Sequence, residues 1–518
     1  MFTRVDSSSI LGMEVIQVEV EVNTSGSLPG IYMVGLPDAA VRESYRRVKA
    51  AIANSGLPFS RQLITVNLAP AHLRKEGSNF DLPIALGILA VSGCMKPSAL
   101  AGRMVVGELA LDGKVRGIRG SLAMALWARR KGREEIIIPL PNLREAARIE
   151  GIRVTGVESL HEALEYLKGN PLERSPVPIP SEEDTEEPCL SEVKGQLQAK
   201  RALEIAAAGF HNLLLIGPPG SGKSMLAQRL PGILPPLTSE EVLEVSSIHS
   251  VAGLLDPDRP LRRRPPFRAP HHSISHVGLA GGGRQLPRPG EITLSHRGVL
   301  FLDELPEFRR DALEVLRQPM ESGNVTISRS LVCTNFPARF LLAAGMNPCP
   351  CGFLGDPQRS CSCSPGKVRK YYSRVSGPLL DRIDLQVEVP RLTPNELVEL
   401  PTGETSDRLR ERVMEARERQ RARWGRGTIA NAHAAMGKIR AACRLGEEEK
   451  RFMYMAAEKL GLTARGFDRC LRVARTIADL AGRERVSVRD LAEAVQYRSL
   501  EKLWGSSSLG EVGYGGGL

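Results

Sequence analysis

The feature that most constrains the fold is a glycine-rich run between an apolar stretch and a helix-like stretch. The run consists of Gly217, Pro218, Pro219, Gly220, Ser221, Gly222, Lys223 and Ser224. It follows the apolar residues 213–216 and precedes residues 225–230, which have a helical pattern. In a turn from strand to helix, glycines let backbone N–H groups point at phosphates, the lysine reaches the β- and γ-phosphates, and the serine hydroxyl binds Mg²⁺. The run therefore predicts a parallel α/β sheet that binds Mg²⁺ and a nucleoside triphosphate.

An acidic pair after a second strand predicts that the nucleotide is hydrolysed. Residues 299–302 are apolar, as in a buried parallel strand, and Asp303 and Glu304 follow directly. Hydrolysis needs one carboxylate to hold Mg²⁺ and another to orient or activate the attacking water. Asp303 suits the first role and Glu304 the second. A third strand at 340–345 brings Asn347 to the same edge, where its amide can position that water, although Asn is also a common turn residue.

Length and pattern indicate several domains. A chain of 518 residues can form about three compact cores. Residues 1–167 mix strand and helix patterns, as in a separate α/β unit, whereas residues 168–188 are rich in proline and acids and are typical of a linker. Residues 189–392 hold the nucleotide motifs, residues 393–503 have a helical pattern, and the Gly- and Ser-rich residues 504–518 are predicted to be disordered.

Hydrophobic periodicity also predicts individual elements within these blocks. Strands are expected at 13–22, 62–68, 103–109 and 135–138, and helices at 39–54, 82–92, 122–131, 447–460, 464–481 and 488–499.

Charge favours a polyanionic partner. The chain carries a formal charge of +11, and five arginines lie among prolines within residues 259–268. A second cluster surrounds Tyr371 and Tyr372, which suits stacking on nucleic acid but is equally common in a plain core. Residues 408–426 hold eight arginines with glutamates at helical spacing, which favours a solvated, salt-bridged helix. The cations of the second cluster are Lys367, Arg369, Lys370 and Arg374.

The sequence gives no sign of a membrane or secretory segment. It lacks a run of about 18 apolar residues, and residues 1–12 lack the apolar core of a signal peptide. We therefore expect a cytoplasmic protein with no membrane partner. Nine cysteines in such a chain argue against a disulfide framework.

Four cysteines lie close together in the sequence as two C-x-C pairs. Four thiolates can surround Zn²⁺ tetrahedrally and staple a loop. The spacing within each pair is shorter than the usual two to four residues of structural zinc sites, so free thiols or a redox-sensitive pair are open alternatives. The four residues are Cys349, Cys351, Cys361 and Cys363.

Several motifs together resemble the magnesium chelatase type of AAA+ ATPase, and within it the YifB/ComM family of DNA branch-migration helicases in natural transformation. The N-terminal pieces at 35–38 (GLPD) and 75–83 (KEGSNFDLP) belong to the same pattern. The resemblance covers nearly the whole chain. Its other motifs are 193–196 (VKGQ), 199–204 (AKRALE), 211–214 (HNLL), 267–272 (FRAPHH), 289–292 (PGEI), 302–308 (LDELPEF), 347–352 (NPCPCG) and 379–384 (LLDRID).

The resemblance implies ATP as the nucleotide and further site residues. Asn347 matches the sensor-1 position, Arg382 the arginine finger that reaches the neighbouring subunit's nucleotide, and Arg465 the sensor-2 arginine of a C-terminal helical lid. A finger that acts on a neighbour implies a ring, usually a hexamer. Taken without the family, Arg382 between Asp381 and Asp384 is more typical of an intramolecular ion pair.

Residues 1–167 resemble the ribosomal-protein-type α+β domain of Lon proteases. Peptide cleavage there needs a nucleophilic serine and a lysine base within hydrogen-bond reach. Phe80 or Asp81 stands where the serine is expected, and Leu122 where the lysine is expected. Ser78 and Ser121 lie nearby, but a short offset along a strand or helix points a side chain elsewhere. We predict a proteolytically inactive scaffold.

Together these features predict a Mg²⁺-dependent ATPase ring that moves along DNA and promotes branch migration. Residues 259–268 and the loop around Tyr371 are the predicted grip on the DNA backbone. One alternative is a chelatase-like ATPase that remodels a protein partner or assists metal insertion. A second, ATP-dependent proteolysis, lacks the Ser and Lys pair.

Overall fold

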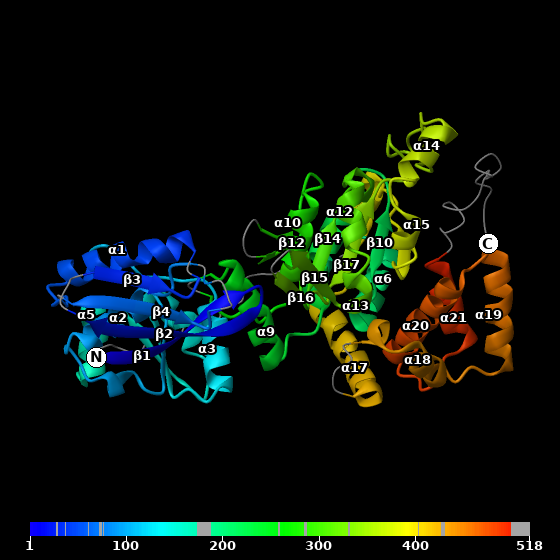
Figure 1. The fold of residues 1–518 in the computed structure, drawn as a ribbon. Coiled ribbons are helices and arrows are strands. Elements are labelled where there is room, and N and C mark those ends of the chain that lie inside the picture. The colour runs from blue at the N-terminus through cyan, green and yellow to red at the C-terminus, as the bar shows by residue number, and fades with distance from the viewer. Residues whose placement is uncertain are drawn as a thin grey trace.

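The computed structural model describes residues 1–26, 30–36, 38–60, 62–71, 75, 77–172, 188–256, 259–283, 287–329, 332–401, 403–425 and 430–498. Figure 1 shows an N-terminal α/β part, a central α/β part and a group of C-terminal helices in succession along an extended molecule. Most of the expected linker at 168–188 and all of the expected tail at 504–518 lie outside the described residues.

The N-terminal part is built on a mixed sheet. Its elements are β1 (Phe2–Leu11), β2 (Glu14–Ser25), β3 (Gly30–Val34), α1 (Ala39–Asn54), β4 (Leu63–Ala69), α2 (Asp81–Val91), β5 (Arg103–Val105), β6 (Glu108–Leu109), β7 (Val115–Arg116), α3 (Ser121–Arg130), β8 (Glu135–Pro139), α4 (Leu143–Ala146), β9 (Arg153–Val157) and α5 (Leu160–Lys168). In the described part of the chain the strand order is β3-β4-β2-β1-β5-β8-β9. Helix α2 packs on β1 and β2 and is buried along its whole length, because nearly all of its residues are apolar.

Most expected elements of this part are present with small shifts. Helix α1 has the expected bounds, and β4 and β8 match to within a residue. The strand expected at 103–109 is instead divided into β5 and β6, because the Gly107 N–H turns away to donate to the carbonyl of Asn79. Strand β1 was not expected. It packs against α2, and three consecutive serines interrupt its apolar pattern.

The central part contains a parallel sheet, as predicted. Its elements are α6 (Leu197–Gly209), β10 (Leu213–Ile216), α7 (Lys223–Gln228), α8 (Leu230–Ile233), α9 (Ser239–Ala252), β11 (Phe267–Arg268), α10 (His276–Ala280), β12 (Gly281–Gly282), β13 (Arg288–Pro289), α11 (Glu291–Leu294), β14 (Val299–Leu302), α12 (Arg310–Val315), α13 (Pro319–Ser322), β15 (Asn324–Arg329), β16 (Val332–Pro337), β17 (Leu341–Met346), α14 (Pro365–Tyr372), α15 (Gly377–Leu380) and β18 (Leu385–Glu388). The sheet order among the described strands is β11-β14-β17-β10-β18.

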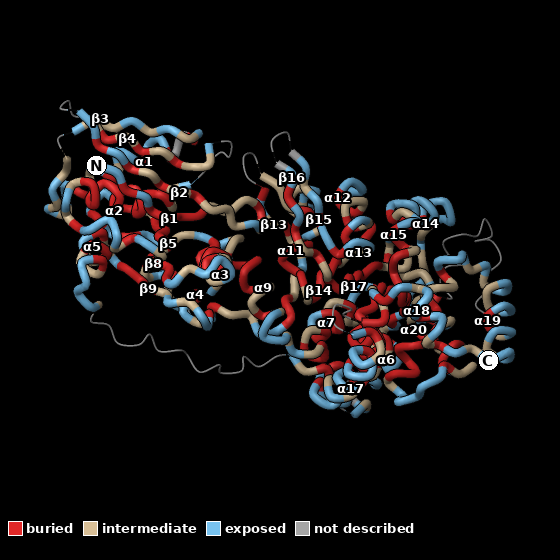
Figure 2. The backbone as a smooth tube through the Cα atoms, turned by 60° about the horizontal axis from the view of Figure 1, so that its bottom comes forward, coloured by how far each residue is buried: buried red, intermediate tan, exposed pale blue. Residues whose placement is uncertain are grey.

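The register of this sheet brings three loops to one edge. Strands β10, β14 and β17 run parallel, with Ile216 opposite Met346 and Leu302 opposite Ala344. All three strands are fully buried because both faces of the sheet are covered, and Figure 2 shows β14 and β17 as buried segments. The residues that follow the three strands therefore lie side by side at their carboxyl ends.

The C-terminal helices share a core with the central sheet. They are α16 (Pro394–Glu399), α17 (Ser406–Trp424), α18 (Met436–Cys443), α19 (Glu447–Leu460), α20 (Ala464–Leu480) and α21 (Val488–Gln496). Helices α17 and α20 pack against α6. One cluster of buried apolar residues includes both Leu213 of the central sheet and Val473 of α20. The salt-bridged character expected for α17 is confirmed, but several partners lie on other elements, such as Glu204 for Arg412 and Asp479 for Arg423.

The N-terminal part contacts the central part through α3 and α9. The Gly120 N–H donates to the carbonyl of Ser250 at 3.0 Å, and the Ser250 hydroxyl donates to Glu145 Oε2 at 2.8 Å. Among the described helices, none is both long and apolar enough to span a bilayer.

Candidate nucleotide-binding site

The glycine-rich run forms the predicted turn between β10 and α7. Gly220 and Gly222 have φ values of 76° and 92°, in the left-handed region that favours glycine. Gly217 is required for another reason, because a Cβ there would lie 2.1 Å from the carbonyl oxygen of Val389. The loop is thus shaped by backbone constraints before any ligand is considered.

Lys223 lies in the mouth of this loop. Its Nζ donates to the carbonyls of Gly217 and Pro218 at 2.8 and 2.9 Å, and to Asn347 Oδ1 at 3.3 Å. Burial lowers the pKa of Lys223, while the negative charges of Asp303 and Glu304 oppose that shift. The Lys223 ammonium group is therefore held between the loop after β10 and Asn347, which follows β17.

Two oxygen ligands suited to Mg²⁺ meet beside this lysine. The Ser224 hydroxyl donates to Asp303 Oδ2 at 2.6 Å. A hydroxyl and a carboxylate are hard oxygen donors of the kind that Mg²⁺ prefers. Gly345 leaves room for Asp303, because a Cβ there would come within 2.8 Å of Oδ1. The pair fits a magnesium ion bound together with phosphate oxygens.

Glu304 turns sharply away from the end of β14. Its φ is +53°, and its N–H donates to Asp303 Oδ1 at 2.9 Å. Its Oε2 lies 3.2 Å from Nδ1 of His272, which follows the edge strand β11. This contact was not expected from the sequence. Its only signal is the histidine pair in the 267–272 motif, at the end of a strand that pairs with β14.

Neither Arg382, expected to reach a neighbouring subunit's nucleotide, nor Arg465 forms a hydrogen bond or ion pair with these residues in the described part of the chain. Arg382 is nearly buried, with Nη2 2.5 Å from Glu321 Oε1 and Nη1 donating to the carbonyl of Pro378 at 2.6 Å. An ion pair within the chain is therefore present, but its partner is neither of the neighbouring aspartates. Arg465 is exposed at the start of α20, capped by the Thr463 side chain.

The structure decides between the two roles left open for the tyrosines in favour of the core. Tyr371 and Tyr372 are 6% and 8% exposed and belong to the core beneath α14, so neither ring is available to a nucleic acid base. Among the arginines of residues 259–268, Arg268 is held by both carboxylate oxygens of Glu291. Arg263 and Arg264 are exposed.

Two relatives decide the family. The chain is 44% identical over 501 residues to the protein YifB of Escherichia coli (strain K12), with 96% of this chain and 97% of YifB covered. It is 43% identical over 508 residues to the competence protein ComM of Haemophilus influenzae, with 96% and 97% covered. The chain belongs to the YifB/ComM family.

Family models relate this YifB/ComM protein to magnesium chelatase. They are described as magnesium chelatase, subunit ChlI (residues 189–397), subunit ChlI of Mg-chelatase (residues 20–142) and magnesium chelatase, subunit ChlI C-terminal (residues 403–498). The chain is also 24% identical over 273 residues to the magnesium-chelatase 38 kDa subunit of Cereibacter sphaeroides, covering 48% of this chain and 73% of that protein. The YifB/ComM protein is thus a chelatase-like AAA+ ATPase, a class that uses ATP and Mg²⁺.

The serines near the expected protease positions are bound to carboxylates. Ser78 donates to Glu108, and Ser121 donates to Glu145. Asp81 is buried and forms two hydrogen bonds with Arg47, at 2.8 and 3.0 Å, while Leu122 is fully buried. The resemblance of this part of the YifB/ComM protein to Lon stays a prediction.

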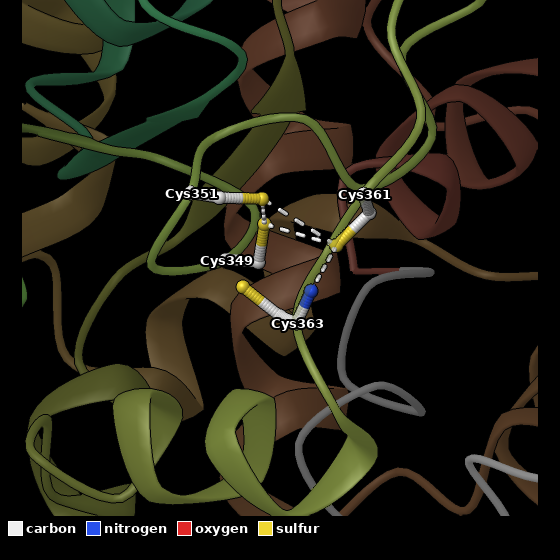
Figure 3. Close-up of side chains that lie close together, drawn as sticks. All are labelled: Cys349, Cys351, Cys361 and Cys363. Atoms are coloured by element: carbon white, nitrogen blue, oxygen red, sulfur yellow. Dashed lines mark hydrogen bonds between the residues drawn. The ribbon is translucent and has the colours of Figure 1, made fainter.

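The four clustered cysteines of the YifB/ComM protein converge in space (Figure 3). Their sulfurs all lie within 4.8 Å of one another, with Cys349 3.3 Å from Cys351 and 3.6 Å from Cys361. Four sulfurs around a zinc ion with bonds of about 2.3 Å are separated by about 3.8 Å. Burial raises the pKa of Cys349 and Cys361, whereas at Cys351 backbone N–H groups of Phe353 and Ser362 outweigh burial and lower the pKa to about 6. The cluster is therefore compatible with zinc.

Proposed function

We propose that this YifB/ComM protein is a ring-forming motor that couples ATP hydrolysis to movement of DNA strands, with branch migration of recombination intermediates as its task. The observation that carries the proposal is the convergence of Lys223, Ser224, Asp303, Glu304 and Asn347 at one edge of the parallel sheet. ATP and DNA both occur in the cytoplasm, where we place the protein.

The hydrolytic roles follow from where each side chain lies. N–H groups of 217–224 would surround the phosphates, and Lys223 would exchange its carbonyl partners for the β- and γ-phosphate oxygens. Ser224 and Asp303 would hold Mg²⁺, which when bound neutralises charge on those oxygens. Glu304 would accept the proton of the attacking water, and Asn347 would orient that water.

In the proposed ring, an arginine of the neighbouring subunit would supply further positive charge at the ATP site. A guanidinium is permanently charged and matches phosphate oxygens in geometry, so Arg382 suits a finger directed at a neighbouring subunit's ATP. The Arg382 side chain is 8% exposed and that of its partner Glu321 is 56% exposed, so a neighbour's nucleotide would have to displace Glu321 and draw the guanidinium outward. Arg465 is exposed at the N-terminal end of α20 and would contact nucleotide when the lid closes.

DNA as the partner is supported by charge and by relationship. The chain carries +11, and Arg263 and Arg264 are exposed on the segment that leads into β11. A relative over nearly its full length is a competence protein. Backbone phosphate contacts give the sequence-independent grip that a motor needs.

We also propose that Cys349, Cys351, Cys361 and Cys363 hold one Zn²⁺. Support comes from the tetrahedral number of ligands and from sulfur separations close to those of a zinc–thiolate site.

The test is the ATPase rate with and without branched DNA over a series of salt concentrations, with Lys223→Ala as the blank. We expect strong stimulation that declines steeply as salt rises, because phosphate contacts release counterions. A rate that is indifferent to DNA but abolished in Lys223→Ala would contradict the DNA motor and leave a working ATPase.

A second candidate is a chelatase-like ATPase that remodels a protein partner or assists metal insertion. The family models and the magnesium-chelatase relative favour it. Stimulation by a protein partner in place of DNA would support it.

A further inference from the structure

The cysteine cluster begins directly beyond the residue expected to sense the γ-phosphate. Strand β17 ends at Met346, Asn347 accepts a hydrogen bond from Lys223, and Cys349 follows two residues later. Residues 349–363, here called the knuckle, lead into α14, and Figure 3 shows the four sulfurs close together. The knuckle is therefore one short connection away from the ATP site.

The inner face of α14 contacts the same connection. The Tyr372 hydroxyl donates to the carbonyl of Pro348 at 2.6 Å, and the Tyr371 hydroxyl is hydrogen-bonded to the backbone of Asn347. Within the knuckle, a Cβ on Gly352 would lie 2.5 Å from Pro219 of the phosphate loop. The two buried tyrosines thus connect α14 to the residues that follow β17, and the close approach at Gly352 places the knuckle against the phosphate loop.

The outer face of the knuckle and α14 is basic. Lys367, Arg369 and Lys370 are exposed on α14, and Arg359 is exposed on the knuckle, where its guanidinium lies 5.2 Å from the Phe353 ring centroid. None of these four cations is in an ion pair with another described residue. Figure 1 shows α14 projecting from the body of the central part. A projecting patch of exposed cations complements a nucleic acid backbone.

From these contacts we propose that the knuckle and α14 form a DNA-phosphate contact that sets the position of Asn347. The inference rests on the proposed DNA motor and names the surface through which DNA reaches the ATP site. DNA bound to the outer cations shifts α14, and the tyrosines pass this shift to Asn347 and the attacking water. Zinc held by the four cysteines would make the knuckle rigid, so that it would move together with α14, whereas a loop closed only by thiols would deform locally.

The cation arm of the test uses the triple variant Lys367→Ala/Arg369→Ala/Lys370→Ala, with fluorescence anisotropy of single-stranded DNA and the ratio of stimulated to basal ATPase rate. Loss of three phosphate contacts makes the negative slope of log affinity against log salt shallower by about 2. We expect affinity at least about tenfold weaker and a stimulation ratio near one. The matched control variant is Lys438→Ala/Arg451→Ala/Lys459→Ala, which removes three exposed cations from the C-terminal helices. We expect it to keep wild-type DNA affinity and the wild-type stimulation ratio.

The zinc arm separates transmission from binding. Elemental analysis should find one zinc per chain in the wild type and none in Cys361→Ser/Cys363→Ser. We expect that variant to bind DNA within a few-fold of wild type but to lose stimulation. Cys361→His, which keeps a zinc ligand, is expected to restore zinc and stimulation, and Cys333→Ser serves as control because Cys333 lies outside the cluster.

Each failure has its own signature. Wild-type stimulation that persists in the triple cation variant, or in a zinc-free folded variant, overturns this inference while the DNA motor stands. A wild type that neither binds DNA nor responds to it overturns both proposals together.

Discussion

Glu304 combines the proposed role of base with a backbone conformation that few glutamates adopt. Its φ of +53° lies in the left-handed region, which costs on the order of 1–2 kcal/mol for a residue with a Cβ. The turn sends the carboxylate toward His272, 3.2 Å away, and its N–H toward Asp303. Such strain persists only where surrounding contacts hold it, and it is commonest at functional sites.

Glu304→Gln should therefore bind ATP but hydrolyse it poorly. General base catalysis contributes about 10²–10⁴-fold, and the amide cannot accept the proton of water. Lys223 and Ser224 are unchanged, so nucleotide titration should give near wild-type affinity while steady-state turnover falls. Glu307→Gln, an exposed carboxylate paired with Arg374, is the matched control. Turnover of Glu304→Gln at the wild-type rate would assign the base elsewhere.

At the scale of elements, α9 carries a buried histidine that resists protonation. His249 is fully buried, and its Nε2–H donates to the carbonyl of Leu294 at 3.2 Å. Burial, together with Arg262 and Arg268, lowers the pKa of His249 to about 3, from 6.5. Between these values the unfolded chain binds the proton and the folded chain does not. Stability is therefore lost as pH falls below about 6.5.

His249→Gln should flatten this pH dependence. Below pH 6.5, a buried histidine that stays neutral lowers the free energy of unfolding by up to about 1.4 kcal/mol per pH unit. We expect the unfolding temperature of wild type to drop more between pH 7.5 and 5 than that of His249→Gln, measured by differential scanning fluorimetry. His161→Gln, on the exposed side of α5, should follow the wild type. Equal slopes in all three proteins would contradict the assignment.

Helix α20 is anchored to the central part by a buried ion pair. Arg469 pairs with Asp384, which is 2% exposed and also accepts the Asn212 N–H at 3.0 Å. Burial raises the pKa of Asp384, but Arg469 and His211 outweigh it and hold the pKa well below its usual range. This pair fixes the C-terminal helices against β18.

Arg469→Leu should loosen the C-terminal helices. Removing one partner of a buried pair leaves an uncompensated charge and costs about 3–5 kcal/mol. Chemical unfolding should show that loss, whereas Arg465→Leu on the same helix, where the arginine is exposed, should unfold like wild type. Equal stability of the two variants would show that the ion pair does not anchor the C-terminal helices.

At the scale of the whole molecule, an arginine finger that acts between subunits predicts complementation. Arg382→Ala keeps its own phosphate loop, and Lys223→Ala keeps its arginine. In mixed rings, a site formed by the first variant's loop and the second variant's arginine is complete. We expect each variant alone to be inactive and the mixture to regain part of the ATPase rate, with a maximum near equal proportions. Mixed assemblies that stay inactive would contradict an intersubunit role for Arg382.

Local sequence was sufficient where backbone constraints decide structure. The glycine-rich run, the apolar strands β10 and β14 and the helices α1 and α19 were predicted with little or no shift, because each depends on neighbours in the chain. The parallel order of the sheet then placed Asp303 and Asn347 beside the loop, as expected of strands whose carboxyl ends share an edge.

Contacts between distant segments were beyond sequence reasoning. The sequence left two roles open for the tyrosines at 371–372, stacking on nucleic acid or packing in a core, and the fold of α14 turns them inward. His272 meets Glu304 only because β11 pairs with β14, and Glu321 meets Arg382 from another helix. In each case the partner is chosen by packing, which a linear pattern does not encode.

Sequence patterns were therefore sufficient to predict the nucleotide loop, the strands that flank it and the identity of its charged residues, because these follow from glycine geometry and hydrophobic period. Packing between distant segments brings the four cysteines together, connects α14 to the Asn347–Pro348 segment through buried tyrosines, and leaves the cations of α14 exposed. The physical reason is that burial and proximity are properties of the packed chain, set when helices cover the sheet.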